Sequence, residues 1–174
     1  MTIFVGGVHA VGKTFVLKPV CETLEIRHAT ASQLIKEQRG LSNWTISRQV
    51  DDIDENQKAL IAAVQRLENE GEQIVLDGHF VLRRAVDIHE PIGIETFSQL
   101  RIRGVILLET PAPIIEDRLK QRGDATWSQA EIESFSEKES QHAKFVCSEL
   151  RIPLVKLSAF SEADISTIIS AWLR

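Results

Sequence analysis

The glycine-rich octapeptide at residues 7–14, Gly-Val-His-Ala-Val-Gly-Lys-Thr, is the feature that most constrains the fold of this chain. It matches the pattern G-x-x-x-x-G-K-[ST] in full. An apolar, β-type run at Thr2–Val5 precedes it, and helix-forming residues follow Gly12. Such a loop requires a strand before it and a helix after it, because the backbone N–H groups of the turn and of the first helical residues must point at one ligand. We therefore expect the chain to open as strand, loop and helix, the start of an α/β domain.

Apolar runs alternate with helical patterns along the rest of the chain. Further short strands are predicted at residues 24–28, 73–76, 105–108 and 152–157. Helices are predicted from about Ser32, from Asp54 to Gly71, from Pro111 to Leu119 and after Ser161, with the hydroxyls of Ser32 and Ser161 as N-caps. The segment 80–99 is expected to be irregular. This order predicts one domain over residues 1–174, with a five-stranded parallel sheet, helices on both faces, and the P-loop nucleoside triphosphate hydrolase and nucleotide kinase fold.

Composition narrows the class of protein. The 174 residues carry 20 Lys+Arg against 25 Asp+Glu, a net charge of −5, and 43% are hydrophobic, which suits one globular core and excludes a disordered chain. The longest stretch without Lys, Arg, Asp or Glu, residues 1–12, is shorter than the ~17–25 residues of a membrane-spanning helix and lacks the features of a signal peptide. We expect a cytoplasmic protein that binds neither membrane nor nucleic acid. Cys21 and Cys147 are expected to be reduced thiols, not zinc ligands.

The octapeptide predicts a site for ATP and Mg²⁺. Backbone N–H groups and the helix N-terminus would hold the phosphates, Lys13 would reach the β- and γ-phosphates, and Thr14 would hold Mg²⁺. His9 is either a phosphate contact or a solvent-facing loop residue. The predicted cofactor-binding residues are Gly7, His9, Ala10, Val11, Gly12, Lys13, Thr14, Phe15 and Arg118.

Polar residues that follow the predicted strands are the other candidates, because ligands of open α/β sheets bind at the carboxyl ends of the strands. Asp77 follows strand 73–76, where its carboxylate can face Mg²⁺ directly or through water, or can simply cap a turn. His79 either contacts an acceptor phosphate or base, or is an exposed or hydrogen-bonded loop residue. Arg118 and Arg122, four apart on one helix, either clamp the transferred phosphoryl group or form a solvated face with Glu116 and Asp117.

The chain resembles the adenylate kinase-like nucleotide kinases, and among them the archaeal type of adenylate kinase. The resemblance covers most of the chain. It rests on the loop at 7–14, on Asp-Glu-Asn-Gln-Lys at 54–58, on Asp-Gly-His at 77–79, and on Thr-Pro at 110–111 leading to Arg118 and to Gly-Asp-Ala-Thr at 123–126.

The resemblance implies a five-stranded parallel sheet, an acceptor-binding region at about 29–72 and a short lid at about 118–130. It implies that Ser32 and Lys36 contact the acceptor nucleotide, that Gln57 reads the acceptor base, and that Arg118 and Arg122 reach the phosphates. Together with the loop and strand-end residues, the predicted acceptor-binding residues are Ser32, Lys36, Gln57 and His79, the predicted catalytic residues are Lys13, Asp77, Arg118 and Arg122, and the predicted metal ligands are Thr14 and Asp77. Two features depart from the family's pattern. Lys36 stands where many relatives have arginine, and Trp-Ser-Gln at 127–129 replaces further lid arginines.

Two functions from different classes follow. The first is an ATP- and Mg²⁺-dependent kinase acting on a small-molecule acceptor, a nucleoside monophosphate such as AMP. Phosphoryl transfer needs mainly positioning and charge neutralisation, which Lys13, Mg²⁺ and the two arginines would supply. The second is an ATP-binding regulatory or accessory module that hydrolyses ATP slowly and acts on a partner protein, which the reduced set of lid arginines favours. The sequence leaves open the acceptor, the oligomeric state and the pathway.

Overall fold

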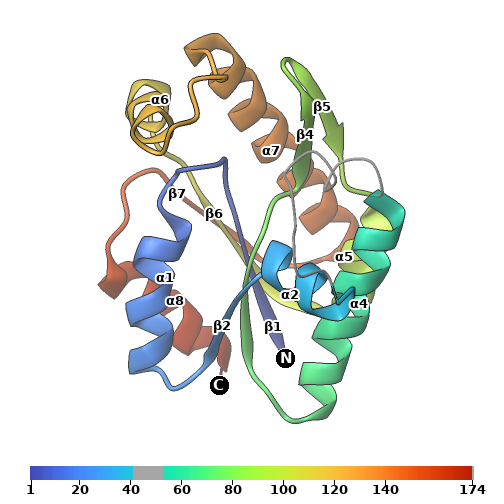
Figure 1. Ribbon diagram of the computed structural model, residues 1–174. Coiled ribbons are helices and arrows are strands. Elements are labelled where there is room, and N and C mark those ends of the chain that lie inside the picture. The colour runs from blue at the N-terminus through green and yellow to red at the C-terminus, as the bar shows by residue number, and fades with distance from the viewer. Residues whose placement is uncertain (41–52, 174) are drawn as a thin grey trace.

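A parallel sheet of five strands in the order β2-β3-β1-β6-β7 lies at the centre of the computed structural model, which describes residues 1–40 and 53–173 (Figure 1). Its strands are β1 (Thr2–Gly6), β2 (Arg27–Thr30), β3 (Ile74–Asp77), β6 (Ile102–Leu108) and β7 (Leu154–Leu157). Thr30 on β2 and Val5 on β1 both lie level with Asp77 on β3, so the carboxyl ends of these strands meet at one edge. The fold class predicted from the sequence is confirmed.

Helices cover both faces of the sheet. The described helices are α1 (Lys13–Thr23), α2 (Ala31–Gln38), α4 (Ile53–Asn69), α5 (Ile94–Gln99), α6 (Ala112–Gln121), α7 (Gln129–Leu150) and α8 (Glu162–Leu173). Helices α1 and α8 pack together on one face, and α4, α5 and α7 lie on the other (Figure 1). Across residues 1–40 and 53–173, no helix is both long enough and apolar enough to cross a bilayer.

The sequence placed two element boundaries wrongly. Strand β2 begins at Arg27 and not at Leu24, because the backbone N–H of Leu24 still bonds to Val20 and that of Ile26 to Cys21, which completes the end of α1. Helix α2 begins at Ala31, and its N-cap is Thr30, whose hydroxyl accepts a hydrogen bond from Gln33 N at 3.2 Å. The predicted N-cap at Ser161 is confirmed: its hydroxyl accepts from Asp164 N, and the Asp164 carboxylate accepts from Ser161 N and Oγ.

The segment 80–99 is not irregular. It forms an antiparallel hairpin, β4 (Val81–Ala85) and β5 (Ile88–Pro91), followed by α5. The hairpin stands apart from the main sheet beside α7 (Figure 1). The long helix α7, which the sequence patterns did not predict, supports it.

Three phenylalanines anchor this segment to the sheet. The ring of Phe80 lies edge-on to Phe4 at 4.9 Å and stacks on Phe97 at 4.8 Å, and all three are fully buried. Gly78 permits this packing, because a Cβ there would lie 2.8 Å from the Phe4 ring. The sheet end that bears Asp77 is therefore held in a tightly packed aromatic cluster.

Both cysteines are buried free thiols. Cys21 lies on α1 and Cys147 on α7, and burial raises the pKa of Cys21 to about 12 and that of Cys147 to about 11. The expectation of two reduced thiols agrees with this finding.

Candidate functional site

A cavity of about 940 Å³ opens at the carboxyl ends of the strands. The glycine-rich loop forms one side, and α2, α4 and the hairpin form the other. From the predicted site residues, the lining includes His9, Ala10, Val11, Gly12, Lys13, Thr14, Phe15, Ser32, Gln57, Asp77, His79 and Arg122. The fold therefore brings residues far apart in the sequence to one cavity, at the sheet edge where open α/β folds bind ligands.

The glycine-rich loop has the backbone conformation of an anion cradle. Gly7 and Gly12 have φ values of 140° and 115°, a region that favours glycine, and Ala10 also has a positive φ of 58°. A Cβ at Gly7 would lie 2.6 Å from the carbonyl oxygen of Leu108. Helix α1 begins directly after Gly12 without a side-chain cap, so its first N–H groups are open to a phosphate at the cavity.

Lys13 lies beneath this loop with its side chain 7% exposed. Its Nζ donates a hydrogen bond to Gly7 O at 2.6 Å and lies 3.7 Å from Asp77 Oδ1. Burial lowers the pKa of Lys13, while the carboxylates of Asp77 and Glu139 oppose that effect. A buried ammonium beside open helix N–H groups is suited to bind the phosphates of a nucleotide.

Asp77 and Thr14 form the candidate metal site. Thr14 Oγ1 donates to Asp77 Oδ2 at 3.0 Å, so the hydroxyl and the carboxylate lie side by side at the cavity. Hard oxygen ligands of this kind fit Mg²⁺, which takes its other ligands from phosphate and water. His28 Nε2 lies 3.9 Å from the same carboxylate, and its nitrogen is buried without a hydrogen bond.

His9, within the loop, and His79 contact each other, with ring centroids 4.2 Å apart and ring planes tilted by 33°. His9 is exposed to solvent, and the ring centroids of Trp127 and Phe135 lie 5.6 and 5.9 Å from its own. Desolvation by the surrounding protein lowers the pKa of His9 to about 4, and burial lowers the pKa of His79 well below its ordinary value; Lys13 adds to both effects. Two neutral imidazoles therefore border the cavity at neutral pH.

Arg118 is bound to the glycine-rich loop. Its Nη1 donates to the carbonyl oxygens of Ala10 at 3.1 Å and Val11 at 2.8 Å. The alternative, a solvated face of Arg118 and Arg122 with Glu116 and Asp117, does not hold for Arg118, because its guanidinium bonds to the loop while Glu116 pairs with Lys120 at 2.9 Å. Arg122 follows α6 and is exposed at the cavity rim, so the two arginines occupy different positions on one side of the site.

The predicted acceptor residues divide into two groups. Ser32 and Gln57 line the cavity, and Gln57 Oε1 is buried there without a hydrogen-bond partner. Lys36 is exposed on α2, outside the cavity lining. Residues 41–52 of the expected acceptor region, 29–72, lie outside the described residues. The far wall is apolar and includes Leu60 and Phe97.

The expected lid, at about 118–130, is packed against the hairpin. Trp127 is only 5% exposed, and the Arg83 guanidinium lies 3.9 Å from its ring centroid. Arg83 also donates to Thr126 O and Oγ1, both at 2.8 Å, and to both oxygens of Glu131 at 2.7 Å. The expected lid lacks further arginines after Thr126, but Arg83 of strand β4 places a cation beside Trp127.

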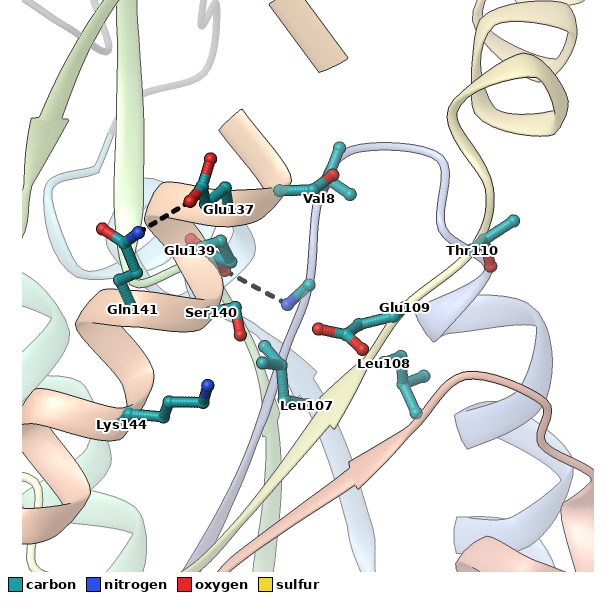
Figure 2. A pocket seen from close by; sticks show the side chains of 12 residues that line it. Val8, Leu107, Leu108, Glu109, Thr110, Glu137, Glu139, Ser140, Gln141 and Lys144 are labelled. Atoms are coloured by element: carbon teal, nitrogen blue, oxygen red, sulfur yellow. Dashed lines mark hydrogen bonds between the residues drawn. The ribbon is translucent and has the colours of Figure 1, made fainter. Parts of the chain in front are cut away.

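Sequence reasoning missed a buried carboxylate, Glu139 on α7. It accepts a hydrogen bond from the backbone N–H of Gly7 at 3.1 Å (Figure 2). It also accepts from Val81 N at 2.8 Å, and Phe80 N donates to both of its oxygens. Burial raises its pKa to about 7 against the effect of these bonds. No motif marks this residue, because its partners are backbone groups.

Glu139 also borders a second cavity, of about 300 Å³, between α7 and the end of β6 (Figure 2). This cavity shares Gly7 and Val8 with the glycine-rich loop. Its other walls include Leu107 and Ser140. Glu139 thus contacts the start of the glycine-rich loop and borders this second cavity.

Comparisons with known proteins agree with this architecture. The model of a family described as AAA domain matches residues 6–136. None of the curated proteins matches the sequence. Similar solved structures include a shikimate kinase from Acinetobacter baumannii in complex with shikimate, with a TM-score of 0.57 at 14% identity over 99% of this chain and 92% of that one. A gluconokinase from Sinorhizobium meliloti 1021 has a TM-score of 0.53 at 17% identity over 99% and 90%. A shikimate kinase from Aquifex aeolicus vf5 has a TM-score of 0.57 at 16% identity over 99% and 96%. At these identities the likeness shows the fold.

Proposed function

Because the chain belongs to the AAA domain family, whose model covers residues 6–136, we propose that it is an ATP- and Mg²⁺-dependent phosphotransferase with a small-molecule acceptor. The observation that carries the proposal is the joint arrangement of three groups at one cavity. These are the uncapped N-terminus of α1, the buried Lys13 ammonium, and the hydrogen-bonded Thr14–Asp77 pair. The cavity volume of about 940 Å³ leaves room for an acceptor beside the donor phosphates.

These groups would contribute positioning and charge. The loop N–H groups and Lys13 would hold the phosphates of ATP, and Arg118 would keep α6 against the loop through its bonds to Ala10 and Val11. Bound Mg²⁺, held by Thr14 and Asp77, would neutralise charge on the phosphate oxygens. Such a site needs no dedicated covalent group, since phosphoryl transfer depends mainly on alignment and electrostatic stabilisation.

We propose a nucleoside monophosphate such as AMP as the acceptor, bound in the region 29–72 and covered by residues 118–130. An apolar wall with Leu60 and Phe97 is suited to a flat base, and the unpartnered Gln57 Oε1 can accept a hydrogen bond from an exocyclic amino group. Arg84 and Arg122 line the same cavity and can meet an acceptor phosphate. The resemblance to archaeal adenylate kinase points to the same acceptor class.

A coupled assay with Mg²⁺-ATP and a panel of acceptors tests this proposal. The panel contains AMP and the other nucleoside monophosphates, with shikimate and gluconate added because two structural neighbours are named for them. We expect turnover with one nucleoside monophosphate above the rate of ATP hydrolysis alone. If only shikimate or gluconate is turned over, the proposed nucleoside monophosphate acceptor is wrong. If no acceptor raises the rate above that of ATP hydrolysis, the kinase proposal is contradicted.

Gln57→Ala separates acceptor binding from donor binding. The acceptor KM should rise about tenfold while the ATP Kd stays unchanged, because Gln57 lies on the acceptor wall. Gln65→Ala is the matched control, since Gln65 is on the same helix and bonds to Gln99 O outside the cavity. Equal effects of Gln57→Ala on both ligands would argue against separate donor and acceptor sites.

A regulatory ATPase that acts on a partner protein is the second candidate. One observation favours it: Val86 and Ile88 at the hairpin are 57% and 58% exposed, an arrangement suited to contact another protein. Slow ATP hydrolysis without any active acceptor, measured in the same panel, would support it.

A further inference from the structure

Helix α7 carries two buried carboxylates, Glu131 and Glu139, each 1% exposed. A carboxylate is expensive to bury unless hydrogen bonds or charges compensate it, so the partners of each residue indicate what it holds in place. The two residues have different partners, which makes the comparison informative.

Glu131 serves the hairpin. It accepts from the guanidinium of Arg83 and from Asp87 N at 2.8 Å, and it lies 3.2 Å from His89 Nε2. These three partners belong to the hairpin β4–β5 and its turn. Burial opposes its ionisation, but these bonds hold the pKa of Glu131 below its usual value.

Glu139 serves two loops at once. Gly7 is the first residue of the glycine-rich octapeptide, and its N–H donates to Glu139 Oε1. The N–H groups of Phe80 and Val81 come directly after the Asp77–His79 segment, and they donate to the same carboxylate. One side chain from a third element therefore bridges the start of the donor loop and the strand end that bears the candidate metal ligand.

The charge of Glu139 also reaches the donor site. Its carboxylate favours the ammonium form of Lys13, together with Asp77. His79 Nδ1 lies 3.8 Å from Glu139 Oε1 and has no hydrogen-bond partner of its own. The carboxylate thus acts on Lys13 through its charge and lies beside His79.

We propose that Glu139 is a positioning residue, which holds the glycine-rich loop and the Asp77–His79 segment at the relative placement that phosphoryl transfer requires. The proposal rests on the proposed phosphotransferase function for its catalytic part. Small displacements between donor and acceptor groups reduce the rate strongly, because the reaction depends on alignment. Glu139→Gln should therefore affect kcat more than the KM of the acceptor. In this variant one carboxylate oxygen becomes an NH₂ group that faces backbone donors.

The experiment compares Glu139→Gln with Glu131→Gln, its match in residue type, helix and burial. The ATP Kd is measured by calorimetry without acceptor, kcat and KM with the acceptor found in the panel, and the Tm by thermal melting. For Glu139→Gln we expect a kcat at least about thirtyfold lower and an ATP Kd about tenfold higher. For Glu131→Gln we expect an unchanged ATP Kd, although its loss of Tm should be at least as large as that of Glu139→Gln.

Several outcomes overturn the proposal. If both variants change the ATP Kd and kcat equally at equal loss of Tm, Glu139 only stabilises the fold. If Glu139→Gln does not fold, Glu139→Asp is used, since it keeps the charge and shortens the reach; an unchanged kcat and ATP Kd in that variant would count against positioning. The ATP Kd is measured without acceptor, so this part of the test still decides the role of Glu139 at the donor loop if the kinase proposal fails.

Discussion

Lys13 is the residue on which the donor site depends most, because its ammonium is buried beneath the loop and beside Asp77. Lys13→Ala should retain the fold and raise the ATP Kd by more than about tenfold, since a charge-assisted contact to phosphate is lost. Calorimetry with Mg²⁺-ATP measures the effect. Lys18→Ala is the control on the same helix, because Lys18 is exposed. An ATP Kd within twofold of the wild type for Lys13→Ala would contradict the phosphate site.

Asp77 contributes a negative charge to the candidate metal site. Asp77→Asn preserves the shape of the side chain but removes the carboxylate that faces Thr14 and Lys13. ATP binding should remain largely intact, while the Mg²⁺ concentration for half-maximal rate should rise about tenfold. Asp117→Asn, at an exposed position on α6, provides the control. A Mg²⁺ titration identical to the wild type would exclude Asp77 as a metal ligand.

Among the secondary-structure elements, the hairpin β4–β5 packs against α7, and the Arg83–Glu131 ion pair joins them. Arg83→Met should lower the free energy of unfolding by about 2–3 kcal/mol, because it leaves the Glu131 carboxylate buried without its cation. Arg84→Met removes the exposed pair with Glu90 and should cost only about 0–1 kcal/mol. Urea denaturation of both variants measures the difference. Equal losses would show that the Arg83 pair adds nothing beyond a surface contact.

The same elements mark where the sequence could and could not predict the fold. Short apolar runs predicted the three central strands β1, β3 and β6 well, because parallel strands buried on both faces carry few polar residues. The edge strands β2 and β7 are only partly buried, and the predicted bounds of β2 were shifted toward α1. Helix α7 escaped this reasoning, since Glu131, Glu139 and Ser140 lie on its buried face and interrupt the apolar stripe. Glu131 pairs with Arg83, 48 residues away, and Glu139 accepts from the backbone of Gly7, 132 residues away, so no local sequence pattern reveals either contact.

The candidate site divides in the same way. The loop at 7–14 was predictable because its chemistry is local and its glycines are required by the backbone. Asp77 was predictable from its place after a strand. The contact of Arg83 with Trp127 and the burial of Glu139 depend on how the hairpin, the segment after α6 and α7 pack together, which is settled by tertiary contacts.

For the whole molecule, three buried or crowded groups set the pH dependence of stability. Between about pH 6.5 and 4.5 the unfolded chain protonates His9 and His79, whereas the folded protein keeps both neutral, so acidification destabilises it. Glu139 opposes this effect, because its folded pKa of about 7 lies above the ordinary 4.5 and the folded state takes up the proton first. Over this pH range the unfolded chain takes up two protons, on the histidines, and the folded protein takes up one, on Glu139. The free energy of unfolding therefore falls as the pH falls.

When one histidine is replaced, the opposite effects of His79 and Glu139 on the free energy of unfolding should nearly cancel. In His9→Asn, the free energy of unfolding should change much less between pH 6.5 and 5 than in the wild type, as measured by urea denaturation. In Glu139→Gln the loss toward acid should be steeper than in the wild type. A wild-type stability that rises on acidification over this range would contradict the lowered histidine pKa values.

The reactivity of the two buried cysteines can report local opening of the fold. Cys21 on α1 and Cys147 on α7 sit on opposite faces of the sheet, and a thiol with a pKa of about 12 or 11 hardly reacts while it stays covered. Labelling by a thiol reagent then counts the openings of each face separately. We expect bound ATP to slow the labelling of Cys21, whose helix begins at the glycine-rich loop. Acceptor binding should slow the labelling of Cys147, whose helix packs against the hairpin. The two labelling rates would then report donor and acceptor occupancy from the natural cysteines of the chain.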